Sequence, residues 1–291
     1  MITVRLKGGM GNQMFQYAFG YRMAKFLDTD LKLDLSILLD RSKKDIVPRN
    51  YDLSIFKLEP QFNLSPKLLK VLYRPKSSKV AKFVKKLSQN GKTYFKEKHF
   101  HVHQELLNTP INDAVYDGWW QSEQYFHSES EAIRQLFSFK SEILEKAKPM
   151  AEQIQSTNAI CLNVRRTDFV KNQTLNTTGL SYFKKAAHYL AERIEDPHFF
   201  VFSDDISWCQ KNIVLPFPTT IVTHDLKGEK FSNYLQLMKS CKHYIIPNSS
   251  FAWWAVWLNG DANKIVVAPK NWFNNPDVDT SDLVPSSWIR L

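Results

Sequence analysis

Five short apolar runs in the second half of the chain constrain its fold more than any other feature. These runs are Ala159–Val164, His198–Ser203, Thr219–Thr223, His243–Pro247 and Lys264–Ala268. Segments with helical spacing lie between them, and Ser181–Arg193 and Ser232–Lys239 are the clearest. Continuous apolar runs separated by helices are typical of parallel strands that are covered on both faces. The second half is therefore predicted to be an α/β domain built on a parallel sheet.

The first half begins with a similar alternation of elements. Ile2–Leu6 is predicted to be a strand, which leads through a glycine-rich turn into a helix over Gln13–Leu27. Asn12 is a residue type that caps helices, and we expect it to cap this one. Leu31–Leu35 follows as a second strand, and a single long helix is expected over Ser128–Gln155. This order of strand, turn, helix and strand also predicts a doubly wound sheet.

The pattern changes near Ser156–Asn158, where we place a domain boundary. A chain of 291 residues is long enough for two ordinary domains. We expect an N-terminal domain over residues 1–155 and a C-terminal domain over residues 156–291. The predicted architecture is two Rossmann-like α/β domains facing a cleft.

The net charge of +10 comes mostly from one segment. Pro66–Lys98 holds eleven Lys and Arg against a single acid, Glu97. Val80, Phe83, Val84 and Leu87 recur in it at helical spacing, with lysines between them. Two interpretations are open: a solvated helix that packs by one face, or a surface helix that lies on anionic lipid. Nucleic acid is the weaker alternative, because few aromatic residues interleave with the basic ones.

The sequence also bears on where the protein works. The N-terminal residues MITVRLKGG read as a strand and a turn rather than a signal peptide, and no apolar stretch is long enough to span a membrane. Three widely spaced cysteines suit a reducing compartment and suggest neither a disulfide framework nor a zinc site. We expect a cytoplasmic protein, with the inner face of the plasma membrane as an open peripheral location.

Two motifs follow predicted strands and suit an anionic ligand. In KGGMGNQ (Lys7–Gln13), glycines allow close approach of the backbone and a helix start presents free amides. NVRRTD (Asn163–Asp168) lies at the carboxyl end of a predicted strand, where ligands of open α/β sheets bind. Arg165 and Arg166 match phosphate oxygens through bidentate forks, and Asp168 is placed to orient one of them.

Two further motifs have the same placement. VFSDD ends in Asp204 and Asp205, which are candidates for ribose or guanine contacts, for a metal, or for a helix cap. A metal is disfavoured because adjacent side chains cannot easily chelate one ion together. In PNSSFAWWAVWL, Asn248–Ser250 form a polar turn before an aromatic helix, and such a start suits a phosphate. His101 and His103 form an HxH pair without an evident third ligand, so no metal site is predicted.

These motifs, taken together and in this order, resemble those of the α-1,2-fucosyltransferases, glycosyltransferase family 11. The matching stretches are GGMGNQMFQYAFGYRMA, WWQSEQYF, NVRRTDF, FSDD and NSSFAWWAVWL, and they span nearly the whole chain. The resemblance implies a GT-B-like fold and transfer of L-fucose from GDP-β-L-fucose to O2 of a galactose-containing glycan. It also implies inversion at the sugar, no cofactor and no essential metal. The alternatives are another GDP-sugar or acceptor position, or a basic module that binds membranes or nucleic acid.

The resemblance also implies roles for particular residues. Arg165 and Arg166 would meet the phosphates, Asp204 or Asp205 the guanine or ribose, and Gly11 and Asn12 the fucosyl group. The other residues implied near the donor are Asn163, Asn248, Ser249, Ser250 and Phe251. Asn163 stands where the family motif usually begins with His. Asp168 is the remaining candidate for a general base, although we expect it to orient an arginine.

Overall fold

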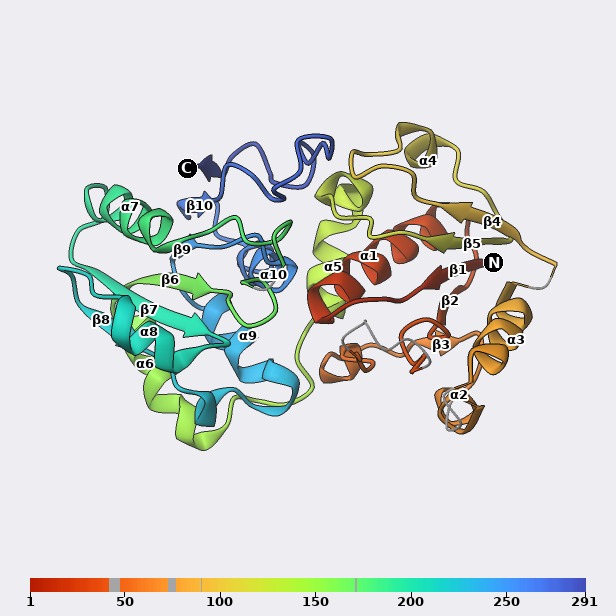
Figure 1. The fold of residues 1–291 in the computed structure, drawn as a ribbon, viewed down its shortest axis with the longest axis horizontal. Helices are drawn as coiled ribbons and strands as arrows, with labels where there is room; N and C mark the ends of the chain where they lie inside the picture. The colour runs from red at the N-terminus through yellow and green to blue at the C-terminus, as the bar shows by residue number, and fades with distance from the viewer. Residues whose placement is uncertain (42–47, 73–76, 90, 171) are drawn as a thin grey trace. The chain divides into compact units, whose positions relative to one another are not determined.

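The computed structural model describes residues 1–41, 48–72, 77–89, 91–170 and 172–291. The chain divides into two compact units, Met1–Lys140 with Ser281–Leu283 and Ser141–Thr280 with Val284–Leu291 (Figure 1). The sequence placed the boundary after residue 155. The structure instead puts helix α6 (Lys148–Ser156) in the second unit, because it packs against β6 and α9 and buries Ile154.

The first unit is built on a five-stranded parallel sheet with the order β3-β2-β1-β5-β4. Its strands are β1 (Ile2–Arg5), β2 (Leu31–Asp34), β3 (Gln61–Phe62), β4 (Thr93–Lys96) and β5 (Ala114–Asp117). Helix α1 (Met10–Phe26) packs closely on β1 and β2. A Cβ atom at Gly20 would lie 2.5 Å from Cγ2 of Val4, so glycine is what permits this approach.

The helix α1 begins earlier than the sequence suggested. Gly9 is the cap, and its carbonyl accepts the amide of Gln13 at 3.1 Å. The prediction that Asn12 caps the helix is wrong, because Asn12 already lies inside the first helical turn. The remaining helices of this unit are α2 (Pro66–Leu72), α3 (Ser78–Gln89), α4 (Gln104–Asn108) and α5 (Ser130–Leu136).

The single helix predicted over Ser128–Gln155 is also wrong. The chain leaves the helical path after α5 and resumes it at α6. Between the two helices, Phe139 forms an antiparallel bridge with Phe56, and the carbonyl of Ser138 accepts the amide of Lys57 at 2.8 Å. These backbone groups therefore bond to a distant segment instead of closing helical turns.

The second unit contains a six-stranded parallel sheet with the order β11-β10-β9-β6-β7-β8. Its strands are β6 (Asn158–Val164), β7 (Pro197–Ser203), β8 (Thr219–Ile221), β9 (His243–Ile245), β10 (Val266–Ala268) and β11 (Ile289–Arg290). Besides α6, its helices are α7 (Leu180–Ala191), α8 (Ile206–Asn212), α9 (Ser232–Lys239) and α10 (Ser250–Leu258). The α/β fold and the five strands predicted for this half are confirmed.

A buried group of charges closes the carboxyl edge of the first sheet. Arg5 and Asp34 end neighbouring strands in register, and Asp117 ends the strand on the other side. Arg5 is fully buried, and its guanidinium donates to Asp34 at 2.9 Å and to Asp117 at 3.2 Å. Asp117 also accepts from Lys7 at 2.9 Å and from the hydroxyl of Tyr94. Burial would raise the pKa of Asp117, but the Tyr94 hydrogen bond and the two cations outweigh it and lower this pKa to about 2.

Asp117→Asn is expected to lower the free energy of unfolding at neutral pH by about 2 kcal/mol. Because the folded pKa lies below the ordinary value of about 3.9, the carboxylate stabilises the fold above about pH 4 and loses this effect as the pH falls towards about 2. In urea titrations, the difference in the free energy of unfolding between wild type and variant should therefore become smaller over that pH range. Glu142→Gln at an exposed carboxylate is the control. A gap for Asp117→Asn that stays constant as the pH falls would contradict this account.

Candidate active site

The paired arginines lie on the loop that follows β6. Val164 at the end of β6 pairs with Ser203 at the end of β7, so Arg165 and Asp204 leave the sheet side by side. The guanidinium of Arg165 donates to Asp168 at 2.6 Å and forms an ion pair with Asp204 at 3.0 Å. A guanidinium has five N–H groups, so these two ion pairs use only part of its capacity. Arg165 is held in place and still has donors to offer an anion.

Asp204 fastens this loop to the end of β7. Its carboxylate accepts the backbone amides of Arg166 at 2.8 Å and of Thr167 at 3.1 Å, and also the hydroxyl of Thr167. With the Arg165 ion pair, both carboxylate oxygens are engaged. In this structure the Asp204 carboxylate holds the arginine loop, and its contact with guanine or ribose stays a prediction.

Asp205 is the cap of helix α8. Its side chain accepts the amide of Trp208 at 3.1 Å, which is the helix-cap alternative from the sequence. The guanidinium of Arg166 lies 3.8 Å from the centre of the Trp208 ring, and its Nε is 3.5 Å from Asp205. Stacking on a half-buried indole fixes the plane of the guanidinium.

The turn between β9 and α10 lies at the same sheet edge, because β9 is the other neighbour of β6. The hydroxyl of Ser249 caps α10 by accepting the amide of Ala252 at 3.4 Å. Ser250 and Phe251 form the first turn of α10 and are partly exposed, so this helix start can face an anion.

Two asparagines of the predicted donor site are buried. Asn248 donates to the carbonyls of Leu175 at 2.9 Å and Trp272 at 2.8 Å, so it ties two loops to the start of α10. Asn163 lies within β6 and donates to the carbonyl of Phe202 at 3.2 Å. Both asparagines brace the backbone around the site.

In the first unit, the corresponding edge holds the turn between β1 and α1. Gly8 has a φ of +78°, and a Cβ atom there would lie 2.4 Å from the side chain of Asn12. Asn12 is partly exposed and accepts a hydrogen bond from Gln121 at 2.6 Å, whereas Gly11 is buried within the helix. The ammonium of Lys7 lies 4.6 Å from the ring centre of Trp119. A glycine turn, an amide pair and an indole therefore come together.

Sequence reasoning missed the residues that shape this turn. The side chain of Gln16 is buried and bonds to both backbone groups of Lys7 and to the carbonyl of Gly118. Glu97 accepts the amides of Trp119 at 2.6 Å and Trp120 at 3.0 Å. Burial raises the pKa of Glu97, against the opposing effect of these amides. The available signal was that Glu97 is the lone acid of a basic segment.

No group of three or more His, Cys, Asp or Glu side chains is arranged to hold a metal ion within the residues that the structure describes. The rings of His99 and His101 stack with their centres 3.4 Å apart, and His103 is buried behind His99 at 3.9 Å. Stacked imidazoles present their faces to one another rather than their nitrogens to a common ion.

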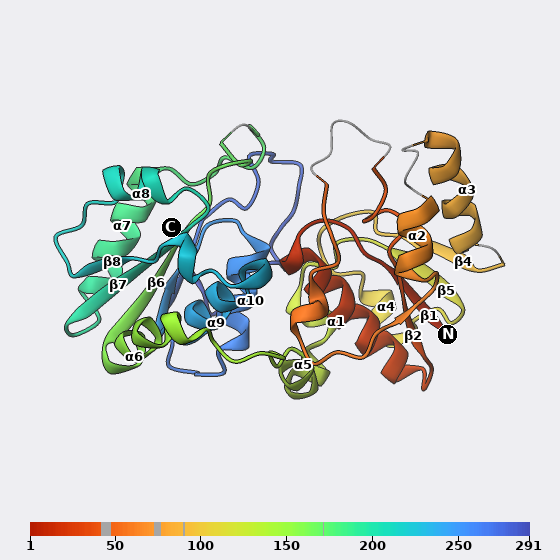
Figure 2. The same ribbon diagram turned by 90° about the horizontal axis from the view of Figure 1, so that it is seen from below.

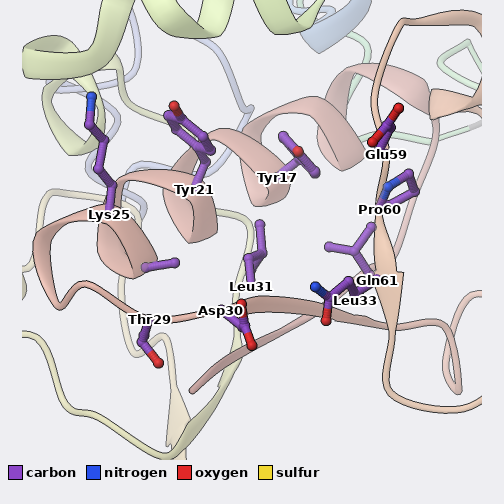
Figure 3. A pocket seen from close by; sticks show the side chains of 11 residues that line it. Tyr17, Tyr21, Lys25, Thr29, Asp30, Leu31, Leu33, Glu59, Pro60 and Gln61 are labelled. Atoms are coloured by element: carbon purple, nitrogen blue, oxygen red, sulfur yellow. The ribbon is translucent and has the colours of Figure 1, made fainter.

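A separate pocket of about 260 Å³ lies in the first unit, between α1 and the strands β2 and β3. Figure 3 shows Tyr17, Tyr21 and Lys25 projecting from α1, with Leu31 and Gln61 coming from the strands. Thr29 and Asp30 mark it as lying at the amino end of β2, whereas the motif residues gather at carboxyl ends. This pocket does not contain any of the predicted site residues.

Arginines, capped helix starts and glycine turns at the carboxyl ends of parallel strands are the features of an α/β protein that binds an anionic ligand such as a nucleotide. The chain matches the family described as Glycosyl transferase family 11 over residues 1–291, and it belongs to this family. The predicted family and the GT-B-like α/β fold are thereby confirmed, and the protein is a glycosyltransferase.

Several relatives are similar over most of their length. The chain is 32% identical to the alpha-1,2-colitosyltransferase of Escherichia coli, over 100% of this chain and 99% of that protein. It is 30% identical to the O-antigen biosynthesis glycosyltransferase WbnK of Escherichia coli, over 98% of this chain and 99% of that protein. It is 24% identical to the galactoside 2-alpha-L-fucosyltransferase Sec1 of Mus musculus, over 89% of this chain and 65% of that protein.

Among solved structures, the fucosyltransferase NodZ from Bradyrhizobium has a similar fold. The TM-score is 0.51 at 15% identity, with 88% of this chain and 92% of that chain covered. At this identity the likeness supports the fold alone.

Proposed function

We propose that this glycosyltransferase moves L-fucose from GDP-β-L-fucose to O2 of a terminal galactoside, with inversion and without an essential metal. The observation that carries the proposal is the arginine loop after β6, with Arg165 and Arg166 each held by a carboxylate. The relatives from Escherichia coli and Mus musculus that are named for their activity both support the α-1,2 linkage, and the mouse galactoside fucosyltransferase supports fucose as the sugar. WbnK's role in O-antigen biosynthesis supports a surface glycan as the setting.

The charge distribution of the reaction suits this loop. When the bond between C1 of fucose and the β-phosphate oxygen breaks, negative charge builds on GDP. Two guanidinium forks and the amides at the start of α10 would stabilise this charge in place of a metal cation. The acceptor oxygen forms the new bond to C1 on the opposite face and releases its proton to the departing phosphate or to water, so the β-linked donor gives an α-linked product and GDP. We assign GDP to the second unit and the acceptor to the first.

On the acceptor side, Asn12 is proposed to hydrogen-bond to the fucosyl group or the incoming galactoside. Its partly exposed side chain is fixed by Gln121, and Gly8 leaves it room. Trp119 offers an indole face of the kind on which pyranose rings stack. Gly11 is proposed to act through its position in the helix start, since it is buried.

Asp168 is proposed to orient Arg165 rather than to remove the acceptor proton, because its carboxylate is paired with that guanidinium at 2.6 Å. Asp168→Asn should then lower the rate by a similar factor at every pH, about tenfold to a hundredfold, since a charge-assisted hydrogen bond contributes about 1.5–3 kcal/mol. A pH–rate profile from pH 5 to pH 9 measures this. Loss of the limb that depends on a deprotonated group would instead identify Asp168 as the base.

Asp204→Asn is expected to reduce transfer by about tenfold or more, because an amide cannot accept all the N–H groups that hold the arginine loop. Asp196→Asn is the matched control, since Asp196 is exposed and lies at the opposite end of β7 from Asp204. Initial rates of both variants, compared at saturating donor, measure the difference. Equal losses would argue against a positioning role that is particular to Asp204.

The proposed substrates are tested by supplying GDP-fucose with a β-galactoside and with its 2-deoxy analogue. Transfer to the galactoside and none to the analogue is expected. Transfer to both would exclude O2 as the acceptor atom.

A second candidate donor is GDP-colitose, favoured by the 32% identical relative. Colitose is L-fucose without the 3-hydroxyl group. A site built to hydrogen-bond that hydroxyl would reject colitose strongly, whereas an apolar site would not discriminate well. The ratio of kcat/KM for the two donors decides between them, and a ratio strongly in favour of GDP-colitose would replace fucose in the proposal.

A further inference from the structure

The helices α2 and α3 present apolar side chains to solvent. Leu68 and Val71 on α2 are 48% and 55% exposed, and Phe83 and Leu87 on α3 are 58% and 46% exposed. The two helices contact each other and lie side by side in both views of the ribbon (Figures 1 and 2). We call these four residues the apolar edge.

The apolar edge is not the surface by which the two helices are held to the unit. Leu69 on α2 and Val84 on α3 are fully buried and anchor each helix. If α3 packed by its whole apolar face, Phe83 and Leu87 would be buried as well. The structure leaves Phe83 and Leu87 exposed, so the interpretation as a solvated helix packed by one face accounts for the buried Val84 and the half-buried Val80 but not for these two side chains.

Lysines surround the apolar edge. Lys67 and Lys70 on α2 and Lys79, Lys82 and Lys86 on α3 are exposed. Lys79 lies four residues before Phe83 and Lys86 three residues after it. On a helix, both therefore lie next to Phe83, on the side turned away from Val84. The sequence contains no acid between Pro66 and Lys96. On each of the two neighbouring helices, lysines with extended hydrocarbon stems therefore lie close in sequence to the exposed apolar side chains.

We propose that the apolar edge and its lysines bind a membrane surface rich in anionic phospholipid. Lysines beside exposed apolar residues suit the boundary between headgroups and acyl chains, where both kinds of side chain gain. Nucleic acid would attract the lysines, but its phosphate backbone would gain nothing from four exposed apolar side chains. The binding that we propose is peripheral, and no helix in the part of the chain that the structure describes is long and apolar enough to cross a membrane. The proposal does not depend on which sugar the enzyme transfers.

The test is co-sedimentation of the full chain with vesicles of phosphatidylcholine alone and of phosphatidylcholine with phosphatidylglycerol. Binding to the anionic vesicles is expected, and it should weaken as salt rises. The combined variant Lys79→Glu, Lys82→Glu, Lys86→Glu should bind at least tenfold more weakly, since each lysine near such a surface contributes roughly fivefold. Phe83→Ser with Leu87→Ser should also lose about tenfold or more.

Matched controls come from the second unit. Lys184→Glu with Lys185→Glu changes exposed lysines on α7, and Val214→Ser changes a side chain that is 69% exposed. Both controls should bind vesicles like wild type, and all variants should retain transfer between soluble substrates. Losses in the controls equal to those at α3 would overturn the proposal, because binding would then follow overall charge.

Three other results would also overturn it. Equal binding to neutral and anionic vesicles would remove the role of the lysines. Sedimentation velocity that shows self-association, abolished by Phe83→Ser, would assign the apolar edge to a second copy of the chain. Tighter binding to double-stranded DNA than to anionic vesicles, lost in the lysine variant, would assign the surface to nucleic acid.

Discussion

Replacing Arg165 with alanine is expected to lower the transfer rate about a hundredfold or more, the effect of removing one preorganised donor of about 3 kcal/mol. Arg165 is held by Asp168 and Asp204 at the carboxyl end of β6, with N–H groups left to offer an anion. Arg165→Lys should also be poor, because a point charge does not replace a planar fork. Turnover under saturating substrates, followed by release of GDP, measures both variants.

Arg193→Ala is the matched control for this experiment. Arg193 is exposed and lies over the ring of Tyr189, as Arg165 lies over the ring of Phe169, but it is not part of the loop after β6. Arg193→Ala should leave the transfer rate unchanged. Near-normal turnover by Arg165→Ala, with a folded protein in each case, would sink the assignment of the arginine loop to the donor.

Replacing Arg5 with methionine is expected to destabilise the protein by about 3–5 kcal/mol. The change removes a fully buried cation and leaves Asp34 and Asp117 close together without it. The free energy of unfolding at neutral pH, from urea titration, measures the loss.

Lys25→Met is the control for the stability experiment. Lys25 also forms an ion pair, with Glu129 at 2.5 Å, but its side chain is 54% exposed. Exposed pairs contribute about 0–1 kcal/mol, so the control should lose little. Similar losses at the two positions would mean that the Arg5 cluster adds no stability beyond that of a surface pair.

The α/β fold could be predicted because parallel strands buried on both faces leave an unambiguous local pattern. The helix α9 and the strand β7 lie close to their predicted bounds. The break before α6 could not be predicted, because it depends on the bridge between Phe139 and Phe56. The sequence around Phe139 has helical spacing, and only a distant partner reveals that its backbone bonds elsewhere.

The sequence indicated which motifs end at the carboxyl edge of the sheet, but it did not indicate which contacts each side chain makes there. Adjacent strands ending together place Arg165 beside Asp204, which requires the register of β6 and β7. Without that register, Asp204 and Asp205 are equivalent candidates for a ligand. In the structure, Asp204 accepts hydrogen bonds from the arginine loop, whereas Asp205 caps helix α8.

The residues that shape the glycine turn were harder still to predict. Gln16 donates a hydrogen bond to the carbonyl of Gly118, and Glu97 accepts one from the amide of Trp119, and both partners are remote in sequence. A polar side chain on a helix or strand does not reveal such partners. The sequence motif around Gly8 therefore indicated a ligand turn without indicating what supports it.

The most direct test of the central claim is transfer from GDP-fucose to a terminal β-galactoside after the enzyme has been treated with EDTA. We predict an α-1,2-linked product by NMR, formed at the same rate with EDTA as with added magnesium or manganese. An enzyme that stops in EDTA and recovers only when a divalent cation is restored would contradict the account, because the arginine loop would not then neutralise the leaving diphosphate by itself.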